Sequence, residues 1–207
     1  MKKWLFTPFF AVTMAFAGHA YAQAADTSTP DGLVRGITTE VMTAVKTDPN
    51  LQKGDVNEII NLVNQKILPH TDFDRTTQLV MGRYWRTATP EQRTQIVEQF
   101  KLLLIRTYSG AISQIRNQQI QYLPFRADAG ATDVVVRTQV INQGQQIELD
   151  YRLRKEEAGW KVYDLNVLGA WLIQAYQQQF AEQIQRSGVQ GLVQFLTTRN
   201  QQLAAGK

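Results

Sequence analysis

The sequence predicts an α+β fold in which helices precede and follow an antiparallel sheet. Three observations support this prediction. Apolar residues recur at helical spacing between residues 31 and 115, alternate with polar residues between 134 and 167, and return to helical spacing after Gly169. Strands that follow one another through short turns pair as an antiparallel meander, so we expect one sheet of three or four strands.

The first helices are defined by their ends. Apolar residues from Leu33 to Val45 recur about every 3.6 residues, and Asp48-Pro49 predicts the end of this helix. Asp55, with Glu58 three residues later, is typical of a second helix start, and Pro69 predicts where that helix stops. A third, short helix is expected over residues 73–85.

The long helix that follows has the clearest start in the chain. Thr89 is the expected N-cap, Pro90 the first helical residue, and Gln92 completes a capping box. Apolar residues from Ile96 to Ile115 then lie on one face. This helix is long for a small domain and should be the central support of the fold.

The expected sheet comprises strands 134–140, 147–154 and 160–167, with turns at 142–144 and 158–159. Apolar and polar side chains alternate along these strands. The pattern predicts an apolar concave face and a charged outer face. Beyond Gly169 a helix is expected, then a break at Ser187-Gly188, then a last amphipathic helix that includes Leu196.

Residues 1–22 have the pattern of a cleaved signal peptide. Lys2 and Lys3 precede an apolar run, and Ala20-Tyr21-Ala22 fits a cleavage site. The run is shorter than the roughly 20 residues that span a bilayer. We therefore expect an exported chain with a mobile arm at 23–30, one domain at 31–200 and a tail at 201–207.

The composition excludes several kinds of chemistry. There is no cysteine, and His70 is the single histidine left after signal removal, so multi-histidine metal sites and cysteine nucleophiles are excluded. Loss of Lys2 and Lys3 lowers the basic residues from 22 to 20 against 18 acidic residues, so the formal charge falls from +4 to +2. Without a basic stripe, nucleic acid is not an expected partner.

Two local patterns suggest catalysis. Residues 72–76 match the D-x-D-x-T loop of a phosphatase family, but no buried strand precedes them, and an acidic helix start explains them better. Asp164 lies in an apolar strand, where a carboxylate beside a cavity could act as a general base, as in ketosteroid isomerases. The alternative is that Asp164 faces outward or caps a backbone group, and this alternative is favoured.

The segment from Gly82 to Arg93, GRYWRTATPEQR, continuing to Phe100, Leu104 and Tyr108, resembles the MlaC / toluene-tolerance family of periplasmic phospholipid carriers. The segments 67–69 and 160–164 also resemble it, as does Gly169 with Tyr176 and Phe180 beyond. The resemblance covers about residues 30–200. The sequence departs from the family pattern at Leu168, at Trp171 and in the segment Ala175-Tyr176-Gln177. The family's polar contacts near the mouth of its lipid pocket are therefore not carried over to this chain.

The resemblance implies a nuclear transport factor 2-like fold, a curved antiparallel sheet wrapped by helices with an extra N-terminal helical part. It implies a non-enzymatic periplasmic shuttle that holds glycerophospholipid as cargo and maintains outer-membrane lipid asymmetry. The implied partners are an outer-membrane lipoprotein–porin complex and an inner-membrane ABC transporter with an MCE-domain ring. We expect a monomer without cofactor, metal or catalytic residue.

Alternation along the strands and helical spacing together predict the lining of a lipid pocket. The predicted lining residues are Phe100, Leu103, Leu104, Tyr108, Val134, Val136, Val140, Ile147, Leu149, Tyr151, Tyr163, Leu165, Val167, Leu168, Trp171, Leu172 and Tyr176. Two other functions stay open from the sequence. One is an isomerase-type enzyme that uses Asp164, and the other is a non-catalytic secreted interaction module with a filled core.

Overall fold

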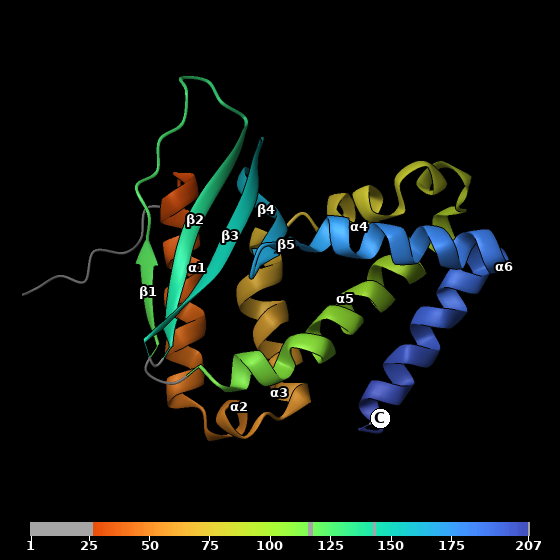
Figure 1. Ribbon diagram of the computed structural model, residues 1–207, viewed down its shortest axis with the longest axis horizontal. Helices are drawn as coiled ribbons and strands as arrows, with labels where there is room; N and C mark the ends of the chain where they lie inside the picture. The colour runs from red at the N-terminus through yellow and green to blue at the C-terminus, as the bar shows by residue number, and fades with distance from the viewer. Residues whose placement is uncertain (1–26, 116–117, 143, 207) are drawn as a thin grey trace, which may run out of the picture.

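The computed structural model describes residues 27–115, 118–142 and 144–206, so the expected signal peptide and the first half of the expected arm lie outside the described residues. The sheet and α1 lie at one side of the molecule, and α4, α5 and α6 extend away from them (Figure 1). The α+β prediction is confirmed. The elements follow in this order: α1 (Pro30–Thr47), α2 (Pro49–Lys53), α3 (Val56–Leu62), η1 (Val63–Ile67), η2 (Leu68–His70), α4 (Phe73–Met81), η3 (Gly82–Thr87), α5 (Pro90–Ser113), β1 (Gln119–Tyr122), β2 (Asp133–Asn142), β3 (Gln145–Glu156), β4 (Gly159–Val167), β5 (Ala170–Trp171) and α6 (Leu172–Ala204).

The second helix begins where the sequence predicts but is less regular than expected. Asp55 Oδ1 accepts hydrogen bonds from Asn57 N at 2.9 Å and Glu58 N at 3.2 Å, which satisfies two free donors of the first turn of α3. The α-helix ends at Leu62. A π-helical turn (η1) and a 3-10 turn (η2) then continue the chain to His70.

Asp72 begins a helix. Its Oδ1 accepts a hydrogen bond from Arg75 N at 3.0 Å, so the D-x-D-x-T match is the N-cap of α4. The α-helix ends at Met81 because Gly82 adopts φ +54°, in the left-handed region that glycine tolerates. The expected helix to Trp85 is therefore completed by the 3-10 helix η3.

The predicted capping box of α5 is confirmed. Thr89 Oγ1 accepts a hydrogen bond from Gln92 N at 3.2 Å, and Gln92 Oε1 accepts one from Thr89 N at 3.1 Å. The helix ends at Ser113, two residues before the expected end. In Figure 1 it runs from beside the bend of α6 toward the sheet side of the molecule.

In the described part of the chain, five strands form one antiparallel sheet in the order β1-β2-β3-β4-β5. The sequence predicts the three long central strands but misses the two edge strands. β1 has four residues and β5 has two, too few to show a clear alternation. Val136 pairs with Tyr151 and Val140 with Ile147, so these apolar side chains share one face, as predicted.

Strand β4 contains one extra residue. Arg152 pairs with Asp164, but the next residue of β3, Leu153, pairs with Val162, so Tyr163 has no position of its own opposite β3. Such a β-bulge places two residues of one strand against one of the other and shifts the alternation of faces by one residue. Simple alternation therefore gives the wrong face at this point.

The predicted break in the C-terminal helix is confirmed. Gly188 has φ +69° and ψ −178° within α6, so the helix axis bends there, and Figure 1 shows the second half folding back beside α5. Helix α1 begins at Pro30, and α6 continues to Ala204.

Replacing Gly188 with alanine should lower the free energy of unfolding by about 1–3 kcal/mol, because residues with a side chain rarely adopt this conformation. An added Cβ would meet nothing within 4 Å, so the effect is conformational rather than steric. Gly110→Ala is the matched control, since Gly110 lies within α5 and also has open space. That change should raise stability by up to about 1 kcal/mol. Urea denaturation of both variants measures the difference, and equal losses would contradict the expectation.

Buried apolar side chains of the described residues form three clusters. The helical cluster lies among α4, α5 and α6 and includes Phe100 and Phe180. The sheet cluster lies between α1 and the sheet and includes Val34, Val136 and Leu153. The N-terminal cluster joins α1, α2, α3 and α5. The sheet and the helical layer therefore have separate hydrophobic cores.

Candidate functional site

The sheet face that packs on α1, here called the inner face, is filled in its first part. Val136, Tyr151 and Leu153 are buried against Leu33 and Val34 of α1. Burial raises the pKa of the Tyr151 phenol above its ordinary value, with a further contribution from Tyr122. This part of the inner face is ordinary core, held by contact with α1.

The second part of the inner face stays partly exposed. Val140 pairs with Ile147, and Leu149 pairs with Val167, so the four side chains form one apolar surface, here called the open patch. All four are half-buried, and within the described ranges only Leu149 joins one of the three packed clusters. An apolar surface on an inner face that protein side chains leave incompletely covered is suited to an apolar ligand.

Ile120 extends the open patch, and the sequence analysis missed it. Ile120 lies on β1, pairs with Val140 and is half-buried. The alternation of Gln119, Ile120, Gln121 and Tyr122 was the available signal, but it spans only four residues. Leu165, a predicted lining residue, packs against the sheet cluster.

The predicted helical residues Phe100, Leu103, Leu104 and Tyr176 belong to the helical cluster instead of the sheet cluster. The Phe100 ring centroid lies 5.0 Å from that of Phe180 and 5.1 Å from that of Tyr176, in edge-to-face contacts. Most of this aromatic surface is therefore used for packing between helices. The predicted lining is divided between two cores.

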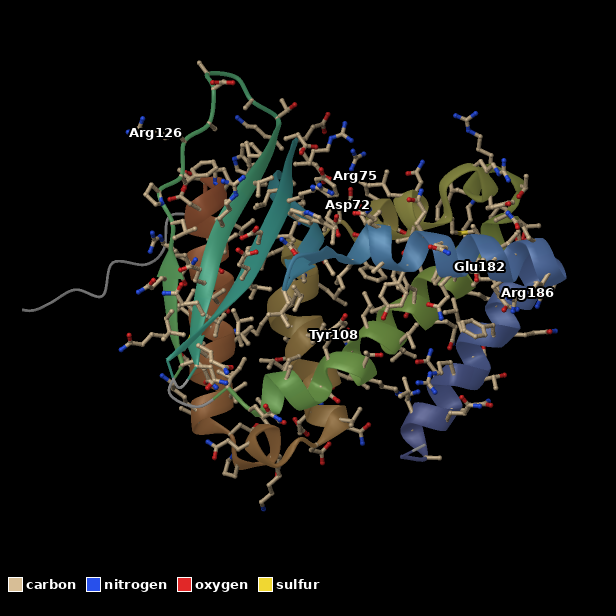
Figure 2. The ribbon with its side chains drawn as sticks, viewed as in Figure 1. Asp72, Arg75, Tyr108, Arg126, Glu182 and Arg186 are labelled. Carbon is tan, nitrogen blue, oxygen red and sulfur yellow. The ribbon has the colours of Figure 1, made fainter. Side chains whose placement is uncertain are left out.

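Tyr108 and Tyr176 lie at the border of the helical cluster. Burial raises the pKa of Tyr176 to about 12, and the neighbouring Tyr108 phenol contributes to the rise. Tyr108, on α5 (Figure 2), is half-buried and belongs to none of the three clusters of described residues. Leu104 and Tyr176 are also half-buried, but unlike Tyr108 they pack against the helical cluster.

The bulge places Tyr163 on the outer face of the sheet, although alternation predicted the inner face. Its hydroxyl donates a hydrogen bond to Asp133 Oδ1 at 2.9 Å, and the Arg75 guanidinium carbon lies 5.1 Å from its ring centroid. Burial raises the pKa of Tyr163 to about 12, and the hydrogen bond and charge of Asp133 add to the rise. These contacts are made away from the open patch.

Asp164 also belongs to the outer face, where its carboxylate has no solvent exposure. Arg152 Nη1 donates a hydrogen bond to Asp164 Oδ2 at 3.0 Å, and Oδ1 accepts from Ile173 N at 3.1 Å and Leu165 N at 3.0 Å. Burial raises the pKa of Asp164, and these hydrogen bonds and Arg152 act in the opposite direction. The carboxylate caps the first turn of α6, as the favoured alternative predicts, and is not free to act as a base on the inner face.

Three further predicted residues lie apart from the open patch. The Arg152 guanidinium carbon lies 3.8 Å from the Trp171 ring centroid, so Trp171 stacks on the outer face instead of forming an inner wall. Leu168 is 70% exposed in the turn between β4 and β5, with φ +54°. Leu172 is buried at the start of α6.

The described residues contain neither a metal-binding cluster nor a membrane-spanning helix. Across residues 27–115, 118–142 and 144–206, no group of three or more histidine, aspartate or glutamate side chains could hold a metal ion. The helices described within these ranges include none that is both long enough and apolar enough to cross a bilayer.

Comparisons with known proteins place these features in context. A family model described as "MlaC protein" matches residues 35–198. A toluene tolerance protein of Pseudomonas putida, ttg2D, is 32% identical over 161 residues, which cover 77% of this chain and 75% of the relative. The intermembrane phospholipid transport system binding protein MlaC of Haemophilus influenzae is 25% identical over 99% of this chain and 94% of its own.

A solved structure provides a further comparison. It is the phospholipid-binding protein from Ralstonia solanacearum, in complex with a phospholipid. It has 52% sequence identity and a TM-score of 0.82, and the match covers 84% of this chain and 98% of that one.

Proposed function

The chain belongs to the MlaC family, and on that premise we propose that it binds glycerophospholipid and carries it across the periplasm between the outer and inner membranes. The observation that carries the proposal is the phospholipid bound by the Ralstonia solanacearum relative, which is 52% identical. The exposed apolar surface of the open patch supports the same conclusion.

The physical need for a carrier is large. Each acyl methylene taken out of water contributes about 0.8 kcal/mol, so two chains of about 14 methylenes each cost on the order of 20 kcal/mol to expose. We propose that the acyl chains lie against the open patch, Leu165 and Tyr108, and that the head group remains outside. The two filled cores on either side would hold these walls in place.

The same proposal includes the cellular setting. A signal peptide at residues 1–22 would export the chain to the periplasm, where a single domain acts as a monomer. The proposed partners are an outer-membrane lipoprotein–porin complex and an inner-membrane ABC transporter with an MCE-domain ring. The proposed role is maintenance of outer-membrane lipid asymmetry, with phospholipid as cargo and no catalytic step.

Organic-solvent extraction of the purified full chain, followed by mass spectrometry, should detect phospholipid at near-stoichiometric amounts. A lipid-free preparation that also takes up no lipid from vesicles would contradict the proposal. The extraction needs no knowledge of the lipid species. It therefore tests binding before any question of transport direction.

Leu149→Lys should reduce the co-purified phospholipid at least about tenfold, because a charged group in contact with acyl chains must be desolvated. Gln146→Lys is the matched control. It adds the same charge to the same strand, but Gln146 is exposed and lies on the outer face by alternation. Quantified lipid per protein should be normal in Gln146→Lys, and equal loss in both variants would remove the open patch from the proposed site.

A further inference from the structure

A pocket of about 430 Å³ opens beside strand β2, away from the open patch. It is lined by Pro124, Phe125 and Arg126 from the β1–β2 loop and by Val135 and Arg137 from β2. Val135 is 37% exposed, so its side chain is accessible from outside. Figure 2 shows Arg126 projecting from the loop at the edge of the sheet.

The pocket is built on ordered contacts. Because β1 pairs with β2 only as far as Thr138, the loop runs alongside the remaining part of β2. Leu123 N donates a hydrogen bond to Arg137 O at 3.1 Å, and Phe125 packs against the sheet cluster. The end of the loop is held where Lys155 N donates to Thr132 O at 2.8 Å.

Among the residues that the structure describes, the lining of the pocket contains two arginine side chains and no acidic side chain. Within the described residues, neither of its two guanidinium groups forms an ion pair, whereas Arg152 on the same outer face is paired with Asp164 at 3.0 Å. Asp150, the cross-strand neighbour of Arg137, instead accepts a hydrogen bond from Asn166 Nδ2 at 3.3 Å. Two arginines that line the same pocket and form no ion pair with any described residue favour an anionic group that accepts several hydrogen bonds.

We propose that this pocket recognises an acidic segment of a partner protein. A carboxylate of the partner binds Arg126 and Arg137, and an adjacent apolar side chain contacts Val135 and Phe125. Arginine and aromatic residues are enriched in the energetic centres of protein interfaces. A concave pocket lined by arginine and apolar side chains fits a side chain inserted from a protein better than it fits the plane of an anionic bilayer. This recognition does not depend on what the open patch binds.

Site-specific photo-crosslinking tests the proposal in cells of the organism that encodes the chain. The full chain carries Val135→p-benzoylphenylalanine, and the adducts are identified by mass spectrometry. We expect an adduct with a protein, joined at a segment that contains aspartate or glutamate. Reversing both charges with Arg126→Glu and Arg137→Glu should reduce its yield at least about tenfold. Arg186→Glu, at an exposed arginine of α6 (Figure 2), should leave the yield unchanged.

The remaining outcomes overturn the proposal. An adduct that survives the double charge reversal, or the absence of any protein adduct, rejects an acidic protein partner. Binding of the purified chain to phosphatidylglycerol vesicles that is lost in the double variant assigns the pocket to a membrane surface instead. The double variant should keep a normal urea midpoint and normal co-purified phospholipid, so failure here is distinguishable from failure of the lipid proposal.

Discussion

Replacing Phe100 with alanine should lower the free energy of unfolding by about 3–5 kcal/mol, the usual range for a phenylalanine removed from a packed core. Phe100 has no solvent exposure, and its ring contacts those of Phe73, Tyr176 and Phe180 from α4 and α6. Removing the ring leaves a cavity among three helices that cannot all move inward together. Urea denaturation should be measured after delipidation, because a bound ligand would add its own stabilisation.

Leu168→Ala is the control for this prediction. It also removes a large apolar side chain, but Leu168 is 70% exposed, so its free energy of unfolding should change by less than about 0.5 kcal/mol. A Phe100→Ala variant that loses less than about 1 kcal/mol would show that the helical cluster is not an essential core. A large loss of unfolding free energy in both variants would mean that the effect is not specific to the buried ring.

Replacing Asp164 with alanine should lower the free energy of unfolding by about 2–4 kcal/mol. The change removes the acceptor of hydrogen bonds from Arg152 Nη1, Ile173 N and Leu165 N. It leaves the guanidinium beside Trp171 without its counter-ion and the start of α6 without its cap. The arginine side chain is 37% exposed and can be partly hydrated, so the loss should be smaller than for a fully buried pair.

Asp164→Asn separates the cap from the charge, because an amide oxygen can still accept from Ile173 N. Its loss should be less than half of that in the alanine variant. The pH dependence provides a second measurement. Because burial raises the pKa of Asp164, the folded state holds the proton to a higher pH than the unfolded state. The contribution of Asp164 is therefore fully present below the ordinary aspartate pKa of about 4 and declines as the pH rises through the higher folded value.

The stability difference between the unsubstituted chain and Asp164→Asn should accordingly be largest in acid and shrink toward neutral pH. Urea denaturation of both chains across that pH range provides the test. A difference that grows with pH would mean that the ion pair with Arg152 outweighs desolvation. In that case the pKa would be lowered instead of raised.

Local signals account for the parts of the fold that the sequence predicts well. The Thr89–Gln92 capping box, the Asp55 helix start and the break at Gly188 depend on a few neighbouring residues, whose conformational preferences are strong. The three long strands show enough alternation to be located. The edge strands β1 and β5 are formed by pairing with a neighbour, and nothing within so few residues requires that pairing.

The candidate site is less predictable because it depends on long-range packing. Alternation correctly groups Val140, Ile147, Leu149 and Val167, but it cannot report the extra residue at Tyr163 that reverses a face. Nor can helical spacing reveal that Phe100 is enclosed by other helices, because its apolar neighbours come from distant segments. Whether an apolar side chain is packed or left available to a ligand is decided by the assembled fold.

The bulge in β4 also affects how this sequence can vary. Tyr163 is the extra residue, so its deletion would place Asp164 directly after Val162 in a regular ladder opposite Arg152 and Leu153. Leu165 and Val167 would keep the inner face, and Asp164 would still reach the start of α6. By contrast, a residue lost between Leu165 and Val167 would turn Val167 to the opposite face. The bulge therefore marks a position where the length of β4 can change by one residue without exchanging the two faces of the sheet.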